Sequence, residues 1–174
     1  MGQRPHYQLF IDGQWVEGAQ GQIMTSENPA TGEDWATFAC AAPADVDQAV
    51  GAARRVLDDP SWRDTAQTQR GKMLYRLAEL IEEHAQEIGR VETTDSGKLL
   101  AETATQSAYV GDYYRYFAGL ADKIEGAVLP IDKPDMHVFT RREPIGVVVA
   151  IVPWNAQMFL TATKLGPALA AGCS

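Results

Sequence analysis

Eight consecutive residues, Ile145–Val152, are apolar apart from one glycine and are rich in β-branched side chains. Such a uniform run is typical of a strand buried on both faces, as in the interior of a parallel sheet. Residues 157–171 follow with helical spacing, Gly172 suits a C-terminal cap, and Cys173 and Ser174 suit the start of another strand. This order of elements predicts an α/β fold in which the chain is truncated after its first βα unit.

The residues before this unit are expected to form hairpins and helices. Alternating apolar residues on either side of Asp12–Gly13 predict a β-hairpin, and residues 28–32 have turn chemistry. Residues 35–40 could form a further strand. The period of the apolar residues then predicts three helices, which run from Pro43 to about Asp58, from about 65 to 88 and from about 99 to 121. The aromatic residues of the third helix, Tyr109–Phe117, are more typical of a core or a subunit interface than of a cofactor site.

A change of period marks the next segment. From Val128 the alternation becomes twofold, which predicts a polar hairpin of residues 128–131 and 136–143 with a proline-containing turn. We expect this hairpin to act as an arm that joins subunits by strand addition or exchange.

Charge and composition exclude several classes of function. The 23 acidic and 15 basic residues give a net charge of −8, which argues against binding to nucleic acid. The run at 145–152 is too short to span a bilayer, and the first ten residues lack the apolar core of a signal peptide, so we expect a cytoplasmic protein and no membrane partner. The two cysteines and three histidines are scattered, which supports neither a disulfide framework nor a zinc site.

The loop after the apolar run is the first place to look for function, because ligands bind at the carboxyl ends of parallel strands. It reads Pro153-Trp154-Asn155 and lacks the glycine-rich dinucleotide fingerprint. The residues alone favour Asn155 as the N-cap of the following helix over a catalytic role. The catalytic interpretation uses its side-chain amide as a donor to a developing oxyanion, and the two interpretations are compatible.

Several motifs, in a fixed order, resemble the aldehyde dehydrogenase superfamily. The most specific are Ile151-Val152-Pro153-Trp154-Asn155 and the downstream Lys164-Leu165-Gly166-Pro167-Ala168-Leu169. Weaker landmarks agree along the whole chain: Ile11-Asp12-Gly13-Gln14-Trp15, Asn28-Pro29-Ala30-Thr31-Gly32, Thr94-Asp95-Ser96-Gly97-Lys98 and Glu143-Pro144-Ile145-Gly146-Val147. The resemblance implies a Rossmann-like cofactor domain with amino-terminal helices and an oligomerisation arm.

The resemblance also implies an activity, the oxidation of an aldehyde to a carboxylic acid with NAD or NADP through a cysteine thiohemiacetal and thioester. Asn155 matches the family's oxyanion donor, and Lys164 matches a lysine linked to proton movement, although a surface or interface lysine is nearly as simple. Cofactor-pocket positions are matched by Ile151, Val152, Pro153 and Trp154. Aldehyde-channel positions are matched by Ala156, Phe159, Leu160 and Thr163. Ser26 and Asp95 resemble a weak monovalent-cation site of some members, and a turn role for Asp95 is equally simple.

The catalytic cysteine and general-base glutamate of the family fall beyond the position matched by Ser174, so we expect this segment alone to be inactive. Cys173 is interpreted as a buried, inert thiol. The expected divisions are residues 1–124 with the hairpins and helices, 125–144 with the arm, and 145–174 with the first strand–loop–helix unit. The resemblance implies a homo-dimer or homo-tetramer. Two alternatives remain open: a stand-alone binding or assembly module, and a reductase or acylating relative on the same scaffold.

Overall fold

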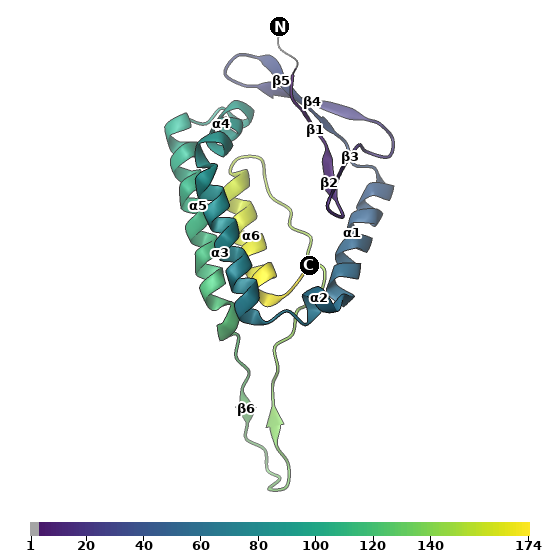
Figure 1. Ribbon diagram of the computed structural model, residues 1–174, viewed down its shortest axis with the longest axis vertical. Coiled ribbons are helices and arrows are strands. Elements are labelled where there is room, and N and C mark those ends of the chain that lie inside the picture. The colour runs from purple at the N-terminus through teal and green to yellow at the C-terminus, as the bar shows by residue number, and fades with distance from the viewer. Residues whose placement is uncertain (1–3) are drawn as a thin grey trace.

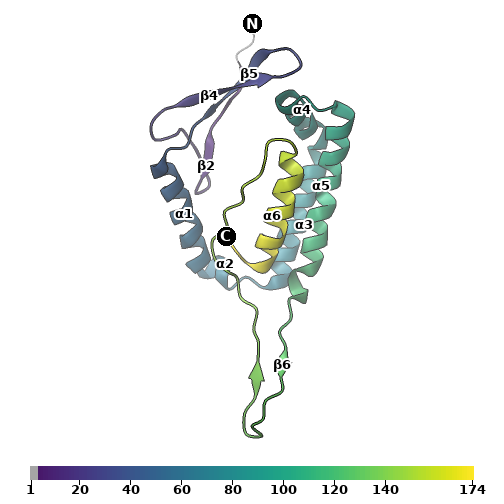
Figure 2. The ribbon, with the colours of Figure 1, turned by 180° about the vertical axis from the view of Figure 1, so that it is seen from behind.

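The computed structural model describes residues 4–174, so the first three residues, part of the segment inspected for a targeting signal, lie outside it. Four helices pack side by side as the body of the molecule (Figure 1). They are α3 (Gln67–Glu83), α4 (Ala85–Ser96), α5 (Leu100–Leu120) and α6 (Gln157–Ala171). Short strands lie at one end of this body, and a hairpin projects from the opposite end, as the view from behind also shows (Figure 2).

The amino-terminal strands confirm the predicted hairpin. Strand β2 (Leu9–Ile11) pairs antiparallel with β3 (Gln14–Val16). The turn between them holds Asp12 and Gly13 at φ of 53° and 75°, the positive values that a tight hairpin turn requires.

A second, three-stranded sheet lies beside this hairpin. Strand β5 (Glu33–Ala39) pairs parallel with β1 (His6–Tyr7) and antiparallel with β4 (Ile23–Asn28). The expected turn of residues 28–32 joins β4 to β5, and Gly32 closes it at φ 70°.

The helices are largely as predicted, with one correction. Helix α1 (Pro43–Asp58) begins at its proline, and the short α2 (Pro60–Arg63) follows. The prediction of one helix over 65–88 is wrong, because the chain turns at His84 and α4 begins there as a separate helix. This turn lets α4 approach α5 closely: a Cβ placed on Gly89 would lie 2.8 Å from the Cα of Ala104.

Small residues at the helix contacts build the core. A Cβ on Gly71 of α3 would lie 2.8 Å from the carbonyl oxygen of Ala118 on α5, so these two backbones touch. Tyr114 of α5 is buried there, and burial raises the pKa of its phenol. The buried apolar residues of this core are Leu74, Ala78, Ile81, Val110, Tyr114, Ala118, Ala121, Ala162 and Ala170.

The projecting hairpin, called here the arm, confirms the predicted hairpin after Val128, although its paired strands are short; its role in joining subunits stays a prediction. After the 3₁₀ turn η1 (Ala121–Lys123), β6 (Val128–Leu129) pairs antiparallel with β7 (Val138–Phe139). Val128 and Phe139 face each other in the register and are 68% and 64% exposed. The arm therefore presents apolar side chains to solvent.

The strand predicted at Ile145–Val152 is not formed within the described residues. The segment is extended, but Ile145 and Ile151 are 90% and 84% exposed. Its backbone makes two bonds to the chain end: Val148 N–H donates to the Ser174 carbonyl at 2.8 Å, and Ser174 N–H donates to the Gly146 carbonyl at 3.3 Å. This is the bonding of a parallel ladder, so Ser174 lies beside Val147 as the predicted second strand would. A strand forms only where a neighbouring segment bonds to it along its length, and here the neighbouring segment contributes a single residue, Ser174.

None of the helices in residues 4–174 combines the length and hydrophobicity needed to cross a bilayer.

Candidate functional site

Asn155 lies in the loop immediately before α6 and is exposed. The prediction that it caps this helix is wrong, because Ala156 occupies the N-cap position at φ −157° and no side chain caps the helix. Within the described residues the side chain of Asn155 makes no hydrogen bond. Its amide is therefore available to a ligand.

Asn155 lines an open groove of about 700 Å³, called here the Asn155 groove. The other lining residues are Lys98, Ala101, Glu102, Thr105, Gln106, Tyr109 and Ala156. The groove thus runs between the start of α6 and one face of α5. The channel residues expected from the sequence lie only on α6 and at its N-cap, so the wall that α5 forms was not predicted. Tyr109 belongs to the aromatic cluster that is typical of a core or a subunit interface; it is 53% exposed and lines this groove.

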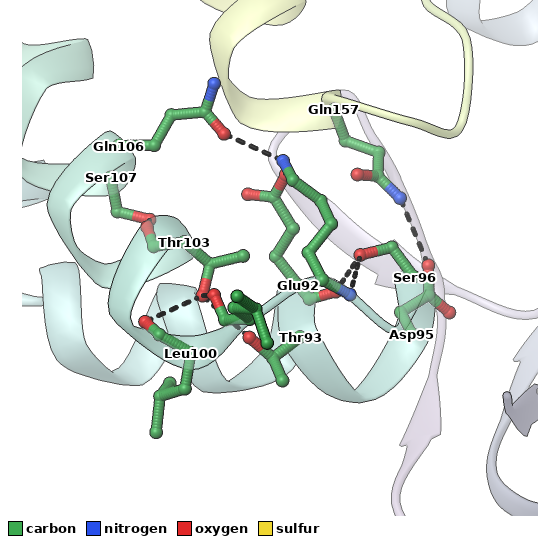
Figure 3. Close-up of polar contacts among 11 residues, drawn as sticks. Glu92, Thr93, Asp95, Ser96, Leu100, Thr103, Gln106, Ser107 and Gln157 are labelled. Atoms are coloured by element: carbon green, nitrogen blue, oxygen red, sulfur yellow. Dashed lines mark hydrogen bonds and ion pairs between the residues drawn. The ribbon is translucent and has the colours of Figure 1, made fainter. Parts of the chain in front are cut away.

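A buried polar cluster supports the α5 wall (Figure 3). The Glu92 side chain on α4 is only 4% exposed, and its Oε1 accepts from Lys98 Nζ at 2.8 Å. Lys98 Nζ also donates to Gln106 Oε1 at 2.7 Å. A buried carboxylate is tolerated only when it is paired, so Glu92 holds Lys98 and Lys98 in turn orients Gln106. The motif Thr94-Asp95-Ser96-Gly97-Lys98 includes Lys98, but no periodicity or motif indicates that Glu92 and Gln106 bond to it.

Asp95 joins the start of α6 to the amino-terminal sheet. Its Oδ1 accepts from Ser26 Oγ at 2.6 Å, and Ser26 Oγ accepts from the indole N–H of Trp35 at 2.8 Å. Its Oδ2 accepts from Gln157 Nε2 at 3.2 Å (Figure 3). The fold therefore brings Ser26 and Asp95 within hydrogen-bond distance of each other, and their use as a monovalent-cation site stays a prediction.

Two acceptors in this region are buried without a partner among residues 4–174, Glu92 Oε2 and Gln157 Oε1. Both residues line a hollow of about 560 Å³ together with Ser26 and Asp95. In the same part of the chain, no group of three or more His, Cys, Asp or Glu side chains is placed to hold a metal ion.

The remaining predicted residues lie along α6 and the segment before it. Phe159 packs its ring edge-to-face on Tyr113 of α5 with centroids 4.8 Å apart, and Thr163 Oγ1 donates to the Leu160 carbonyl at 2.9 Å. Lys164 is exposed further along the helix and is not among the residues that line the Asn155 groove.

The four predicted cofactor residues form an extended stretch. Ile151, Pro153 and Trp154 are exposed and Val152 is half-buried. Cys173 is buried, as expected for a thiol without a catalytic role.

Comparison with known proteins gives consistent matches along the chain. The model of the aldehyde dehydrogenase family matches residues 15–174. The chain is 54% identical over 168 residues to (Z)-2-((N-methylformamido)methylene)-5-hydroxybutyrolactone dehydrogenase of Acinetobacter baylyi, covering 97% of this chain and 34% of that protein. It is 41% identical to a putative aldehyde dehydrogenase of Bacillus subtilis, covering 95% of this chain and 34% of that protein.

Solved structures agree with these matches. A betaine aldehyde dehydrogenase variant of Staphylococcus aureus in complex with NAD+ superposes with a TM-score of 0.92 at 36% identity, covering 96% of this chain and 33% of that one. A Bacillus cereus aldehyde dehydrogenase mutant gives a TM-score of 0.94 at 36% identity, covering 97% and 34%. The predicted α/β fold class is confirmed, and the chain spans about a third of the length of the relatives it matches.

Proposed function

Since this chain belongs to the aldehyde dehydrogenase family, we propose that it is the amino-terminal part of an NAD-dependent enzyme that oxidises an aldehyde to a carboxylic acid. The relative with 54% identity is named for a dehydrogenase reaction, and a related structure at 36% identity was solved with NAD+. Both observations support the reaction class and the cofactor.

The residues that would hold NAD are Ile151–Trp154. The fit rests on their chemistry: Ile151, Pro153 and Trp154 are exposed and apolar, so they can pack against the flat rings of a cofactor. Trp154 adds a large apolar surface that is 75% exposed. When bound, NAD+ supplies the hydride acceptor of the oxidation. The chain's own residues contribute shape and backbone contacts to its binding.

The observation that carries the proposal is the free amide of Asn155 at the groove. When a nucleophile adds to an aldehyde, the carbonyl oxygen becomes an oxyanion, and a fixed N–H donor stabilises that charge more than it stabilises the neutral carbonyl. Asn155 would act as this donor. Lys164 would assist proton movement. Ala156 at the N-cap of α6 and Phe159, Leu160 and Thr163 within the helix would line the aldehyde path.

Asn155→Ala tests this role in the full-length protein. Loss of one oxyanion donor costs about 2.7 to 4 kcal/mol of transition-state stabilisation, so kcat should fall about a hundredfold or more. The matched control is Gln86→Ala, which removes an exposed amide on α4 outside the groove and should leave kcat unchanged. A near-normal kcat for Asn155→Ala, measured as NADH formation at saturating aldehyde, contradicts the assignment.

The arm is also the part of the chain through which we propose that the protein assembles. The exposed apolar side chains of the arm, Val128, Met136 and Phe139, are suited to pairing with another copy of the protein as a homo-dimer or homo-tetramer. We further propose a cytoplasmic enzyme whose chain divides into residues 1–124 with the hairpins and helices, residues 125–144 with the arm, and residues 145–174 with the first strand–loop–helix unit.

A further inference from the structure

The α5 wall of the Asn155 groove offers a hydrogen-bond donor that the proposed reaction does not use. Gln106 lines this groove together with Asn155 and Ala156. Its Oε1 accepts from Lys98 Nζ at 2.7 Å, whereas its Nε2 has no partner in residues 4–174. Figure 3 shows this amide nitrogen on the far side of the amide from the dashed bond.

Lys98 makes this donor directional. An amide side chain can turn over and exchange its oxygen and nitrogen, but an ammonium group bonds only to the oxygen end. Because the buried Glu92 holds Lys98 at 2.8 Å, the oxygen of Gln106 is kept on the Lys98 side. The two N–H groups are therefore kept on the opposite side, with their donors uncommitted.

The charges around the groove disfavour an anionic ligand. Lys98 is already neutralised by its ion pair with Glu92, and Glu102 adds a further carboxylate to the lining. A negatively charged group would meet a net negative wall, whereas a neutral carbonyl oxygen would meet the amide donor without that penalty. Ala156, a small residue opposite α5, leaves room in the groove for such a group.

We propose that Gln106 is a specificity-determining residue that binds an uncharged carbonyl oxygen of the substrate, so that the enzyme prefers aldehydes carrying a second, neutral acyl group. The inference rests on the proposed function, because it assumes that the aldehyde reacts beside Asn155. It adds a substrate class and a residue on α5 to that proposal.

The test compares three aldehydes of similar size in the full-length protein: levulinaldehyde, which carries a ketone; pentanal, which carries none; and succinic semialdehyde, which carries a carboxylate. Gln106→Glu keeps the side-chain shape and an oxygen for Lys98 but removes both amide donors. Gln106→Leu removes the hydrogen bonding altogether. Gln86→Glu, an exposed position on α4, is the matched control for the added charge.

The expected result is a change in substrate preference. The unchanged protein should prefer levulinaldehyde in kcat/KM, and both Gln106 variants should lower that value about three- to tenfold, as for the loss of one neutral hydrogen bond, while pentanal changes less than about twofold. Parallel losses for levulinaldehyde and pentanal, or a preference of the unchanged protein for succinic semialdehyde, overturn the inference alone. No NAD-linked oxidation of any of the three aldehydes by the unchanged protein refutes the proposed function and the inference with it.

Discussion

Removal of the Lys98 ammonium should destabilise the protein strongly, because it leaves the Glu92 carboxylate buried without a cation. The Glu92 side chain is 4% exposed and the Lys98 side chain 24% exposed, so the pair is screened far less than a surface pair. Breaking a buried pair by deleting one partner costs about 3 to 5 kcal/mol. Partial exposure of Lys98 lets water approach the stranded carboxylate, so we expect about 3 kcal/mol for Lys98→Met, roughly a hundredfold in the folding equilibrium constant.

The assay is urea unfolding of the full-length protein at neutral pH, followed by circular dichroism. The double variant Glu92→Gln/Lys98→Met removes both charges and should recover most of the lost free energy, because replacing both partners of a buried pair is often nearly neutral. The control is Lys123→Met, which breaks an exposed pair with Asp122 and should change stability little. A Lys98→Met protein as stable as the parent, or a double variant less stable than the single one, would refute the reasoning.

Two further predictions concern the helical body. Gly89→Ala should lower the free energy of unfolding by about 1 to 3 kcal/mol, because the new Cβ would lie 2.8 Å from the backbone of Ala104. The control Gly119→Ala has room for a methyl group and should instead stabilise the protein by about 0.5 to 1 kcal/mol. Urea midpoints that fail to separate the two variants would contradict the close α4–α5 contact. Hydrogen bonds from the Arg115 guanidinium lower the pKa of Glu82, so this carboxylate stabilises the fold above its ordinary titration range and loses that contribution as the pH falls through the lowered pKa. The deficit of Glu82→Gln in urea midpoint should therefore be present at pH 7 and shrink below about pH 4, and a deficit independent of pH would contradict it.

Local patterns predicted most elements of this fold because their causes are local. Asp12–Gly13 accepts the positive φ values of a tight turn, Pro43 suits the first turn of α1, and Gly172 ends α6 in the left-handed conformation at φ 91°. The break at His84 depends instead on a tertiary contact. Backbone hydrogen bonds continue on both sides of His84, and the turn brings Gly89 against α5. The periodicity of the apolar residues in α3 does not indicate this contact.

The candidate site divides in the same way. Asn155 could be found from the sequence because it follows an apolar run and belongs to a specific motif, although its expected capping role fails because Ala156 lies between it and the first residue of α6. Gln106 could not be found, because its proposed role depends on two distant segments. One is the buried Glu92, fourteen residues earlier in the chain, and the other is the loop before α6 that carries Asn155. The spacing of residue types along the chain does not show that Glu92, Lys98 and Gln106 contact one another.

The apolar run Ile145–Val152 shows why a strand prediction needs both a pattern and a partner. Its β-branched side chains favour an extended backbone, and the backbone is extended, but the hydrogen bonds of a ladder belong to two segments at once. Within the described residues, only Ser174 makes backbone hydrogen bonds to this segment, at Gly146 and Val148. That single parallel contact sets the register at Val147. The extended segment then runs directly into the loop that carries Asn155. The position of the proposed oxyanion donor is thus tied to a strand pairing, so substitutions that disturb the Val147–Ser174 contact should lower kcat without touching the Asn155 groove.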